Sequence, residues 1–281
     1  MYIGNHLSSA KGYEAMGKQA VRLGGETFAF FTRNPRGGKA KDIDPQDVQA
    51  FGQLAEENHF GKLVAHAPYT MNCCAAKENL RDFAREIMAD DLRRLEMTPG
   101  NYYNFHPGSH VGQGAEVGIS KIAEILNEVL TKDQSTIVLL ETMSGKGTEV
   151  GRNFEELARI YDGVKYNDKL RVCFDTCHVN DSGYDLVNDL SATLEKFDKI
   201  IGTDQIAVFH INDSKNELGA GKDRHENIGK GCIGFETLHK IVHLPEFESV
   251  PKILETPYIK DENDSKNSYP PYKEEIAMLR K

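Results

Sequence analysis

Short apolar runs alternate along the chain with longer amphipathic stretches. The apolar runs are rich in β-branched and aromatic residues, which is typical of strands that lie inside a folded domain. Eight such runs occur, at residues 2–6, 26–32, 63–68, 101–107, 136–142, 169–176, 205–212 and 251–257. The sequence therefore predicts eight strands.

Helical periodicity follows these strands. The clearest example is 77–95, where apolar residues recur with the i, i+3, i+4, i+7 spacing of one helix face: Leu80, Phe83, Ala84, Ile87, Met88 and Leu92. A second helix is predicted at 120–130, with Ser120 as its N-cap and Glu124 in its first turn. The same spacing predicts helices at 189–201, 234–243 and 272–280.

The repeat of strand and helix favours one architecture over another. Eight units in 281 residues average about 35 residues each, which agrees with the roughly 250-residue size of a (β/α)8 barrel. An open doubly wound sheet would also alternate strand and helix, but the units lack its Gly-rich phosphate loop. Because no linker or low-complexity tract divides the chain, we predict a single TIM-barrel domain over residues 1–281.

Composition narrows the class of protein. Lys and Arg number 34 against 43 Asp and Glu, giving a formal net charge of −9, which excludes a protein that coats nucleic acid along a basic face. No apolar run approaches the ~20 residues of a membrane span, and the first residues show no signal-peptide core. The five cysteines are odd in number and form no CxxC pair. We therefore expect a cytoplasmic protein without membrane association.

Potential metal ligands follow the predicted strands in a regular way. One His, Asp or Glu stands at or near the carboxyl end of each strand from the third to the eighth: His66, His106, Glu141, Asp175, His210 and Glu255. In a barrel these ends meet on one face, where active sites are built. Three carboxylates so close together would repel one another unless a cation neutralised them. Mixed imidazole and carboxylate ligands suit zinc.

Three more candidates lie in the loops beyond these strand ends. His178 follows Asp175 within one turn, and Asp223 and His225 stand in the Gly-rich segment GAGKDRHENIGKG. Nine ligands suffice for two or three zinc ions, at three to four per ion with sharing. Cys173 and Cys177 alternate with the ligand positions, so we expect them to be buried core residues. His59, His239 and His243 are assigned to the surface or to packing.

With these residues in view, the sequence resembles the endonuclease IV family of zinc-dependent apurinic/apyrimidinic endonucleases. The resemblance covers nearly the whole chain. The motifs that carry it, in the order of the family, are NFHPGSH (104–110), DTCH (175–178), FHINDSK (209–215), DRHENIGKG (223–231) and LET (254–256).

The resemblance implies a TIM barrel with three zinc ions, although manganese or iron at one position is an alternative. It assigns His66 and His106 to the first ion and makes Glu141 the bridge to the second. Asp175, His210 and Glu255 complete the second site. The third ion is assigned to the remaining loop ligands, His178, Asp223 and His225.

The family's activity is implied in the same way. Its members cleave double-stranded DNA on the 5′ side of an abasic site, leaving a 3′-hydroxyl and a 5′-deoxyribose phosphate. A zinc-bound hydroxide would be the nucleophile, with Glu141 and Glu255 as the catalytic carboxylates. Removal of 3′-blocking groups is a further expected activity. A monomer would suit a protein that wraps a bent duplex.

DNA contacts match the family pattern only in part. Arg36 and Tyr69 stand where the family places residues that enter the minor groove at the lesion, but Thr70 stands where a leucine is expected. The segment NPRGGKAK (34–41) lacks the family's usual Trp. Because such residues replace lost base stacking, these departures concern lesion binding rather than chemistry. Loop cations expected to add to the phosphate contacts are Arg33, Arg36, Lys39, Lys215, Lys222, Arg224 and Lys230.

Two other functions remain as alternatives. A sugar isomerase or epimerase on the same barrel would use one or two divalent ions held mainly by carboxylates, which the five histidines of the ligand set disfavour. A metal-buffering or DNA-scaffolding protein would bind lesions without cleaving them, which a complete ligand set disfavours.

Overall fold

Eight parallel strands form a closed barrel in the computed structural model, which describes residues 1–98, 100–260 and 267–281. The order around the barrel is β1-β10-β7-β6-β5-β4-β3-β2, so each strand pairs with its neighbours in the chain and β10 pairs with β1. The barrel predicted from the sequence is confirmed. The strands are β1 (Ile3–Leu7), β2 (Thr27–Phe31), β3 (Val64–His66), β4 (Tyr102–Phe105), β5 (Ile137–Glu141), β6 (Leu170–Asp175), β7 (Ile206–His210) and β10 (Lys252–Leu254).

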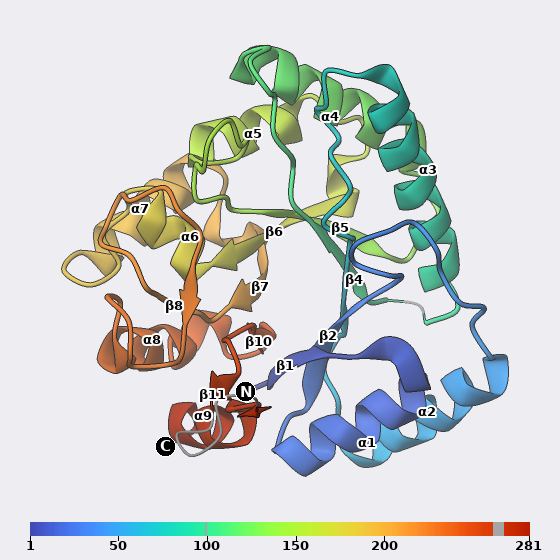
Figure 1. The fold of residues 1–281 in the computed structure, drawn as a ribbon, viewed down its shortest axis with the longest axis vertical. Helices are drawn as coiled ribbons and strands as arrows, with labels where there is room; N and C mark the ends of the chain where they lie inside the picture. Colours follow the sequence, from blue (N-terminus) through green and yellow to red (C-terminus); the bar gives the residue numbers. More distant parts are fainter. Residues whose placement is uncertain (99, 261–266) are drawn as a thin grey trace.

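Helices surround the strands on the outside of the barrel (Figure 1). The α-helices are α1 (Tyr13–Leu23), α2 (Pro45–Glu57), α3 (Glu78–Leu95), α4 (Ala115–Val129), α5 (Phe154–Asp162), α6 (Thr176–Asp181), α7 (Leu190–Ile200), α8 (Phe235–Val242) and α9 (Tyr272–Leu279). Short 3-10 helices are η1 (Ser9–Lys11), η2 (Asn167–Lys169), η3 (Thr203–Gln205) and η4 (Pro245–Phe247). Two hairpins, β8 (Asp213–Ser214) with β9 (His225–Glu226) and β11 (Ile259–Lys260) with β12 (Ser268–Tyr269), lie outside the barrel.

One helix begins earlier than the sequence indicated. Ser120 does not cap α4, because the helix starts at Ala115 after Gly114, whose φ of 94° lies in the left-handed region. Ser120 and Glu124 are exposed residues inside the helix, and the buried face already includes Gly118 and Ile119. The prediction was wrong because a serine shortly before an apolar stretch was given more weight than the glycine that precedes the helix.

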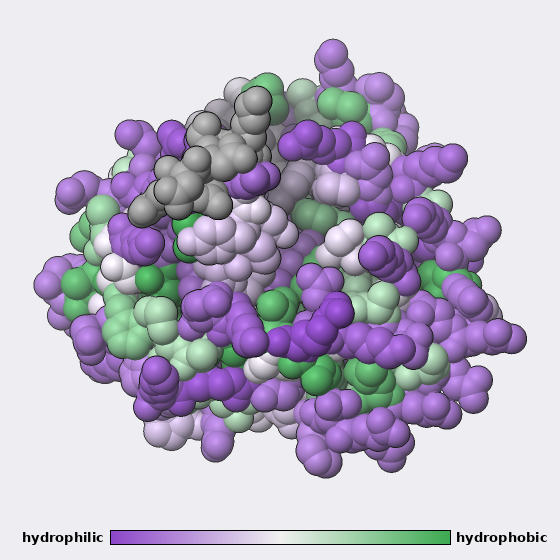
Figure 2. Space-filling view, turned by 60° about the horizontal axis from the view of Figure 1, so that its bottom comes forward, coloured by the Kyte–Doolittle hydropathy of each residue, from purple (hydrophilic) through white to green (hydrophobic). Residues whose placement is uncertain are grey.

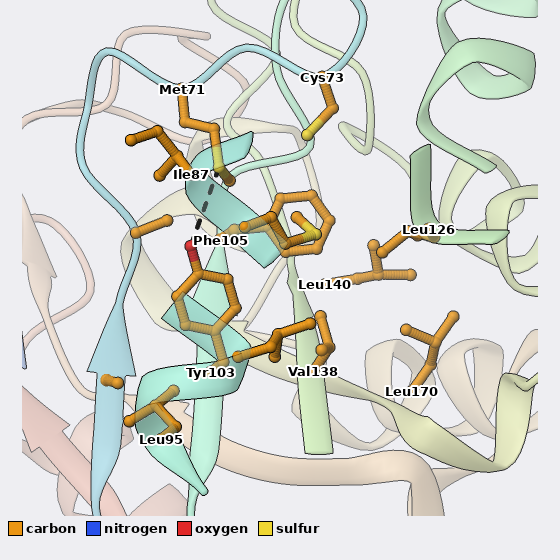
Figure 3. Packing of buried hydrophobic residues seen from close by; sticks show 14 of the residues in the cluster. Met71, Cys73, Ile87, Leu95, Tyr103, Phe105, Leu126, Val138, Leu140 and Leu170 are labelled. Carbon is orange, nitrogen blue, oxygen red and sulfur yellow. Dashed lines mark hydrogen bonds between the residues drawn. The ribbon is translucent and has the colours of Figure 1, made fainter. Parts of the chain in front are cut away.

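The core has two layers. Small and branched residues fill the barrel interior, among them Ala29, Val64, Leu139, Cys173, Val208 and Ile253. Larger side chains pack between the strands and the helices. Figure 3 shows this outer layer, where Tyr103, Phe105 and Leu140 from β4 and β5 meet Leu95 of α3 and Leu126 of α4. This close packing holds the strand ends in a fixed arrangement.

The burial of two cysteines agrees with the prediction from the sequence. Cys173 and Cys177 are fully buried, as predicted, and burial raises the pKa of the Cys173 thiol to about 12. Hydrophilic residues cover most of the face shown in Figure 2, and hydrophobic ones form small separate patches. Among the described helices, none has the length and apolar character that crossing a membrane requires.

Candidate metal centre

The carboxyl ends of the strands bring six ionisable side chains to one mouth of the barrel. His66, Glu141, Asp175 and His210 are the last residues of β3, β5, β6 and β7, and His106 and Glu255 each follow a strand directly. The register of the sheet aligns these ends, since Asp175 pairs with His210 and Glu141 with Cys173. The sequence spacing therefore becomes proximity in space.

A first set of ligands meets on one oxygen of Glu141. His66 Nε2 lies 3.4 Å and His106 Nε2 lies 3.2 Å from Glu141 Oε2. The ligand atoms of these three residues all lie within 4.8 Å of one another. This is a compact three-ligand group with donors suited to zinc.

A second set uses the other oxygen of the same carboxylate. His210 Nδ1 lies 3.2 Å from Glu141 Oε1, 3.2 Å from Glu255 Oε2 and 3.6 Å from Asp175 Oδ2. The ligand atoms of these four residues also lie within 4.8 Å of one another. Glu141 thus stands between the two sets, with one oxygen facing each.

The third set combines a short helix with a long loop. Asp175 Oδ1 accepts a hydrogen bond from His178 N at 2.8 Å, so the carboxylate caps α6 and its first turn places His178 beside the other ligands. From the loop, Asp223 Oδ1 lies 3.0 Å from His178 Nε2 and 3.6 Å from His225 Nε2. The Asp223 backbone has a φ of 53°, a left-handed conformation that Asp tolerates better than most residues.

One buried carboxylate orders that long loop. Asp213 in β8 accepts backbone hydrogen bonds from Gly229, Gly231, Ile233 and Gly234 at 2.9–3.3 Å. The β8–β9 hairpin, in which Asp213 pairs with Glu226 and Ser214 with His225, then brings His225 to the mouth. The Asp213 carboxylate therefore holds in place the loop that carries Asp223 and His225.

The buried carboxylates of the cluster are stabilised in their ionised form by the histidines around them. Burial alone would raise the pKa of the Glu141 carboxyl, but His106 and His210 outweigh it and hold the pKa well below its ordinary value. Burial would also raise the pKa of Asp223, but hydrogen bonding and charge attraction from His178 outweigh burial and lower the pKa to about 2. The pKa of His178 rises well above its ordinary value because Asp175 and Asp223 outweigh burial. The carboxylates are ionised at neutral pH and attract cations.

Backbone and amide groups orient the imidazoles and carboxylates. His66 and His178 each place Nδ1 against a backbone carbonyl, that of Ala67 at 2.7 Å and that of Thr142 at 2.8 Å, so Nε2 faces the cluster. Asn104 donates to Glu141 Oε2 at 2.5 Å, and Asn212 donates to Asp175 Oδ2 at 2.7 Å.

The sequence interpretation did not assign these two amides. Asn104 and Asn212 lie inside NFHPGSH and FHINDSK, so the motifs contained the signal, but an Asn beside a ligand is not distinctive by itself.

A sixth histidine, also unassigned from the sequence, borders the cluster. His6 in β1 lies with its ring 4.4 Å from that of Phe31 and 6.2 Å from that of His66. Its Nε2 is buried, and burial lowers its pKa to about 4, so the ring is neutral. The predicted first strand ended at His6, and that position was the only signal available.

The two residues expected to contact DNA lie on adjoining loops. Tyr69 N donates to the carbonyl of Pro35 at 3.0 Å, which joins the loop after β3 to the loop that carries Arg36. Arg36 is exposed, and Tyr69 is 65% exposed with its ring 6.5 Å from that of His106. Tyr69 therefore borders the mouth, and Arg36 lies on the loop that is joined to it.

Arg33 does not join the exposed cations, contrary to the expectation from the sequence. Its guanidinium is buried and donates to Asp91 Oδ1 at 2.5 and 3.0 Å, to Asp90 at 2.8 Å and to the carbonyl of Gly38 at 2.6 Å. Thr32 and Tyr103 complete the hydrogen bonds of Asp91. The other loop cations are all exposed: Arg36, Lys39, Lys215, Lys222, Arg224 and Lys230.

Comparison with known proteins first defines the class of this barrel. The family described as "Xylose isomerase-like TIM barrel" matches residues 18–281. This class is defined by the same closed arrangement of eight strands that the chain forms.

Closer relatives then define the family. The probable endonuclease 4 of Clostridium botulinum (strain Alaska E43 / Type E3) is 56% identical over 278 residues, covering 99% of this chain and 97% of the relative. The crystal structure of endonuclease IV from Thermus thermophilus has a TM-score of 0.83 and 30% identity, covering 100% of this chain and 98% of that one. The chain belongs to the endonuclease 4 family and is a hydrolase of the endonuclease IV type.

The same barrel also occurs in sugar epimerases. The D-psicose 3-epimerase from Clostridium cellulolyticum H10 has a TM-score of 0.64 at 12% identity, covering 95% of this chain and 89% of that one. At this identity the likeness shows a shared fold alone. The 56% identity to an endonuclease 4 therefore outweighs the epimerase alternative.

Proposed function

We propose that the chain is a zinc-dependent apurinic/apyrimidinic endonuclease of DNA base-excision repair. It hydrolyses the phosphodiester on the 5′ side of an abasic site in double-stranded DNA, leaving a 3′-hydroxyl and a 5′-deoxyribose phosphate. The same chemistry would remove blocking groups from 3′ ends. The observation that carries the proposal is the position of Glu141 between two ligand sets, with one carboxylate oxygen facing each.

The residues of the cluster fit three zinc ions. His66 and His106 would hold the first with Glu141, and Asp175, His210 and Glu255 would complete the second. The third would be held by His178, Asp223 and His225. The buried Nε2 atom of His225 has no hydrogen-bond partner in the part of the chain that the structure describes, and it lies 3.6 Å from Asp223 Oδ1 and 3.8 Å from Asp175 Oδ2. A buried nitrogen atom without a partner, close to ionised carboxylates, is the kind of donor that a zinc site requires.

The chemistry follows from this arrangement. Bound zinc would lower the pKa of a water molecule and would provide positive charge to bind the phosphate oxygens. Glu141 fixes the separation of the first two ligand sets. Glu255 retains partial access to solvent, with 18% of its side chain exposed, so its ionised carboxylate can accept a proton from water entering the mouth. These two carboxylates are the proposed catalytic residues.

DNA recognition is assigned to the rim of the mouth. Arg36 and Tyr69 are the proposed contacts to the duplex at the lesion, because they lie on joined loops beside His106. The exposed loop cations would contact phosphates, a sequence-independent interaction that weakens with salt. An acidic protein can therefore bind DNA through one local surface.

The setting of the enzyme is part of the proposal. It acts as a monomer in the cytoplasm. All five cysteines are free and four are buried, which is in keeping with a reducing compartment.

Cleavage of an abasic-site oligonucleotide, with and without chelator, tests the proposal alongside metal quantification. We expect incision on the 5′ side, loss of incision after chelation, and recovery when zinc is restored. A single bound manganese ion without incision would support the epimerase alternative instead. Tight lesion binding without incision in zinc-replete buffer would support a scaffolding protein.

A further inference from the structure

The loop between β4 and α4 holds a valine in a strained backbone conformation. Val111 has a φ of 46°, in the left-handed region that β-branched residues rarely adopt. Its side chain is 64% exposed, so apolar burial does not compensate for the strain. Among the described residues, Val111 is the only β-branched residue with a positive φ.

Contacts from two neighbouring loops hold this conformation in place. On one side, the Asn72 side chain donates to Ser109 O at 3.0 Å and accepts from Ser109 N at 3.1 Å. On the other side, Thr148 Oγ1 accepts from Val111 N at 3.1 Å, and Thr148 O accepts from His110 N at 2.9 Å. Strain that the surroundings enforce is found most often where a protein binds or acts.

The position of the loop suggests what it binds. Asn72 lies three residues after Tyr69, so the two loops that carry Tyr69 and Val111 are joined directly by hydrogen bonds. His106 of the first ligand set precedes Val111 by five residues. Tyr69 and Val111, at 65% and 64%, are the most exposed large hydrophobic side chains among the described residues. Two unusually exposed apolar groups therefore lie on joined loops at the rim of the metal centre.

We propose that Val111 is a specificity-determining residue that inserts beside Tyr69 into the gap left by the missing base. This inference rests on the proposed function. An apolar side chain in such a gap replaces the lost base stacking. Intact DNA has no such gap, so the side chain would favour the damaged duplex. Thr70, next to Tyr69, is polar, and Val111 supplies the second apolar group of the rim.

Replacement by glycine separates the side chain from the backbone conformation. Val111→Gly removes the methyl groups and also the strain, because glycine adopts positive φ without cost. We expect an equal or higher melting temperature, a roughly tenfold rise in the Kd and KM for abasic duplex, and a kcat within about twofold of wild type. The affinity for undamaged duplex should not change. Val111→Leu should restore the preference for the lesion.

A matched control uses Val21 of α1, which is 40% exposed on the outside of the barrel. Val21→Ala should leave the Kd for both duplexes unchanged. Wild-type preference for abasic over undamaged duplex in Val111→Gly would overturn this inference alone. A wild-type protein without such a preference would overturn the inference together with the proposed function.

Discussion

Glu141 combines two roles that a neutral amide could not combine. Its two oxygens face different ligand sets at 3.2–3.4 Å. Its ionisation depends on the histidines around it, since burial alone favours the neutral acid. The residue therefore links the geometry of the centre to its charge.

Replacing Glu141 tests this link. Glu141→Gln keeps the shape but removes the charge, and we expect kcat/KM on abasic duplex to fall on the order of 10³-fold or more, with metal content reduced. His225→Ala should also abolish cleavage by removing a ligand of the third set. The exposed Glu217 of the neighbouring loop is the control, and Glu217→Gln should cleave normally. Wild-type rates with full metal in either ligand variant would contradict the assignment.

A second residue, far from the mouth, makes stability depend on pH. Lys252 in β10 is fully buried, and its ammonium donates to the backbone carbonyls of Phe247 and Glu248. Burial lowers its pKa from 10.5 to about 8. Above pH 8 the folded chain has released this proton, whereas the unfolded chain keeps it until about pH 10.5. The unfolded state then binds more protons, so this lysine adds stability as pH rises through the window.

Comparison of wild type with Lys252→Met isolates that contribution. Between about pH 8 and about pH 10.5, the unfolding free energy of wild type should rise relative to that of Lys252→Met by on the order of 2 kcal/mol. Urea denaturation at several pH values measures it. Lys273→Met, at an exposed position of α9, should give a difference that does not vary with pH. A constant difference for Lys252→Met would show that the folded lysine titrates normally.

At the scale of elements, strand positions were predictable from the sequence and loop partners were not. Each predicted strand overlaps an observed one. The strands of a barrel are buried, so they appear in the sequence as short runs of β-branched and aromatic residues. Arg33 was placed among exposed cations because a charged loop residue usually lies in solvent. Its partner Asp91 is 58 residues away in α3, and no local pattern pairs them. The Gly114 start of α4 was missed because glycine is a weaker N-terminal signal than serine.

The Arg33–Asp91 pair joins a loop to a helix and is expected to stabilise both. Removing one partner leaves a buried charge, so Arg33→Met or Asp91→Leu should each cost about 3–5 kcal/mol. The double variant should cost clearly less than the sum, as measured by urea denaturation. Because Arg36 lies three residues further along this loop, KM for abasic duplex should rise as well. The exposed pair Arg159–Glu116 serves as the control, and additive losses at Arg33 and Asp91 would contradict the coupling.

At the scale of the whole molecule, metal binding and folding should be coupled. The nine ligands come from six strand ends, one helix and one long loop, so they meet only in the folded chain. Ions that bind the folded state alone stabilise it, by about 2.7 kcal/mol at a concentration roughly 100 times Kd. For a chain of this size we expect chelation to lower the melting temperature by about 5–10 °C. Glu141→Gln should show a smaller change, and identical melting with and without zinc would argue against the centre.

Asp213 has a consequence for how the molecule opens. Its carboxylate binds four backbone amides of the loop that presents Asp223 and His225. Surface loops usually exchange their amide hydrogens through small local fluctuations. These amides can reach solvent only if a carboxylate buried just beyond the end of β7 is released too. The loop therefore unfolds in the same cooperative unit as the barrel. The amides that hold the third ligand set in place should exchange as slowly as those of the sheet.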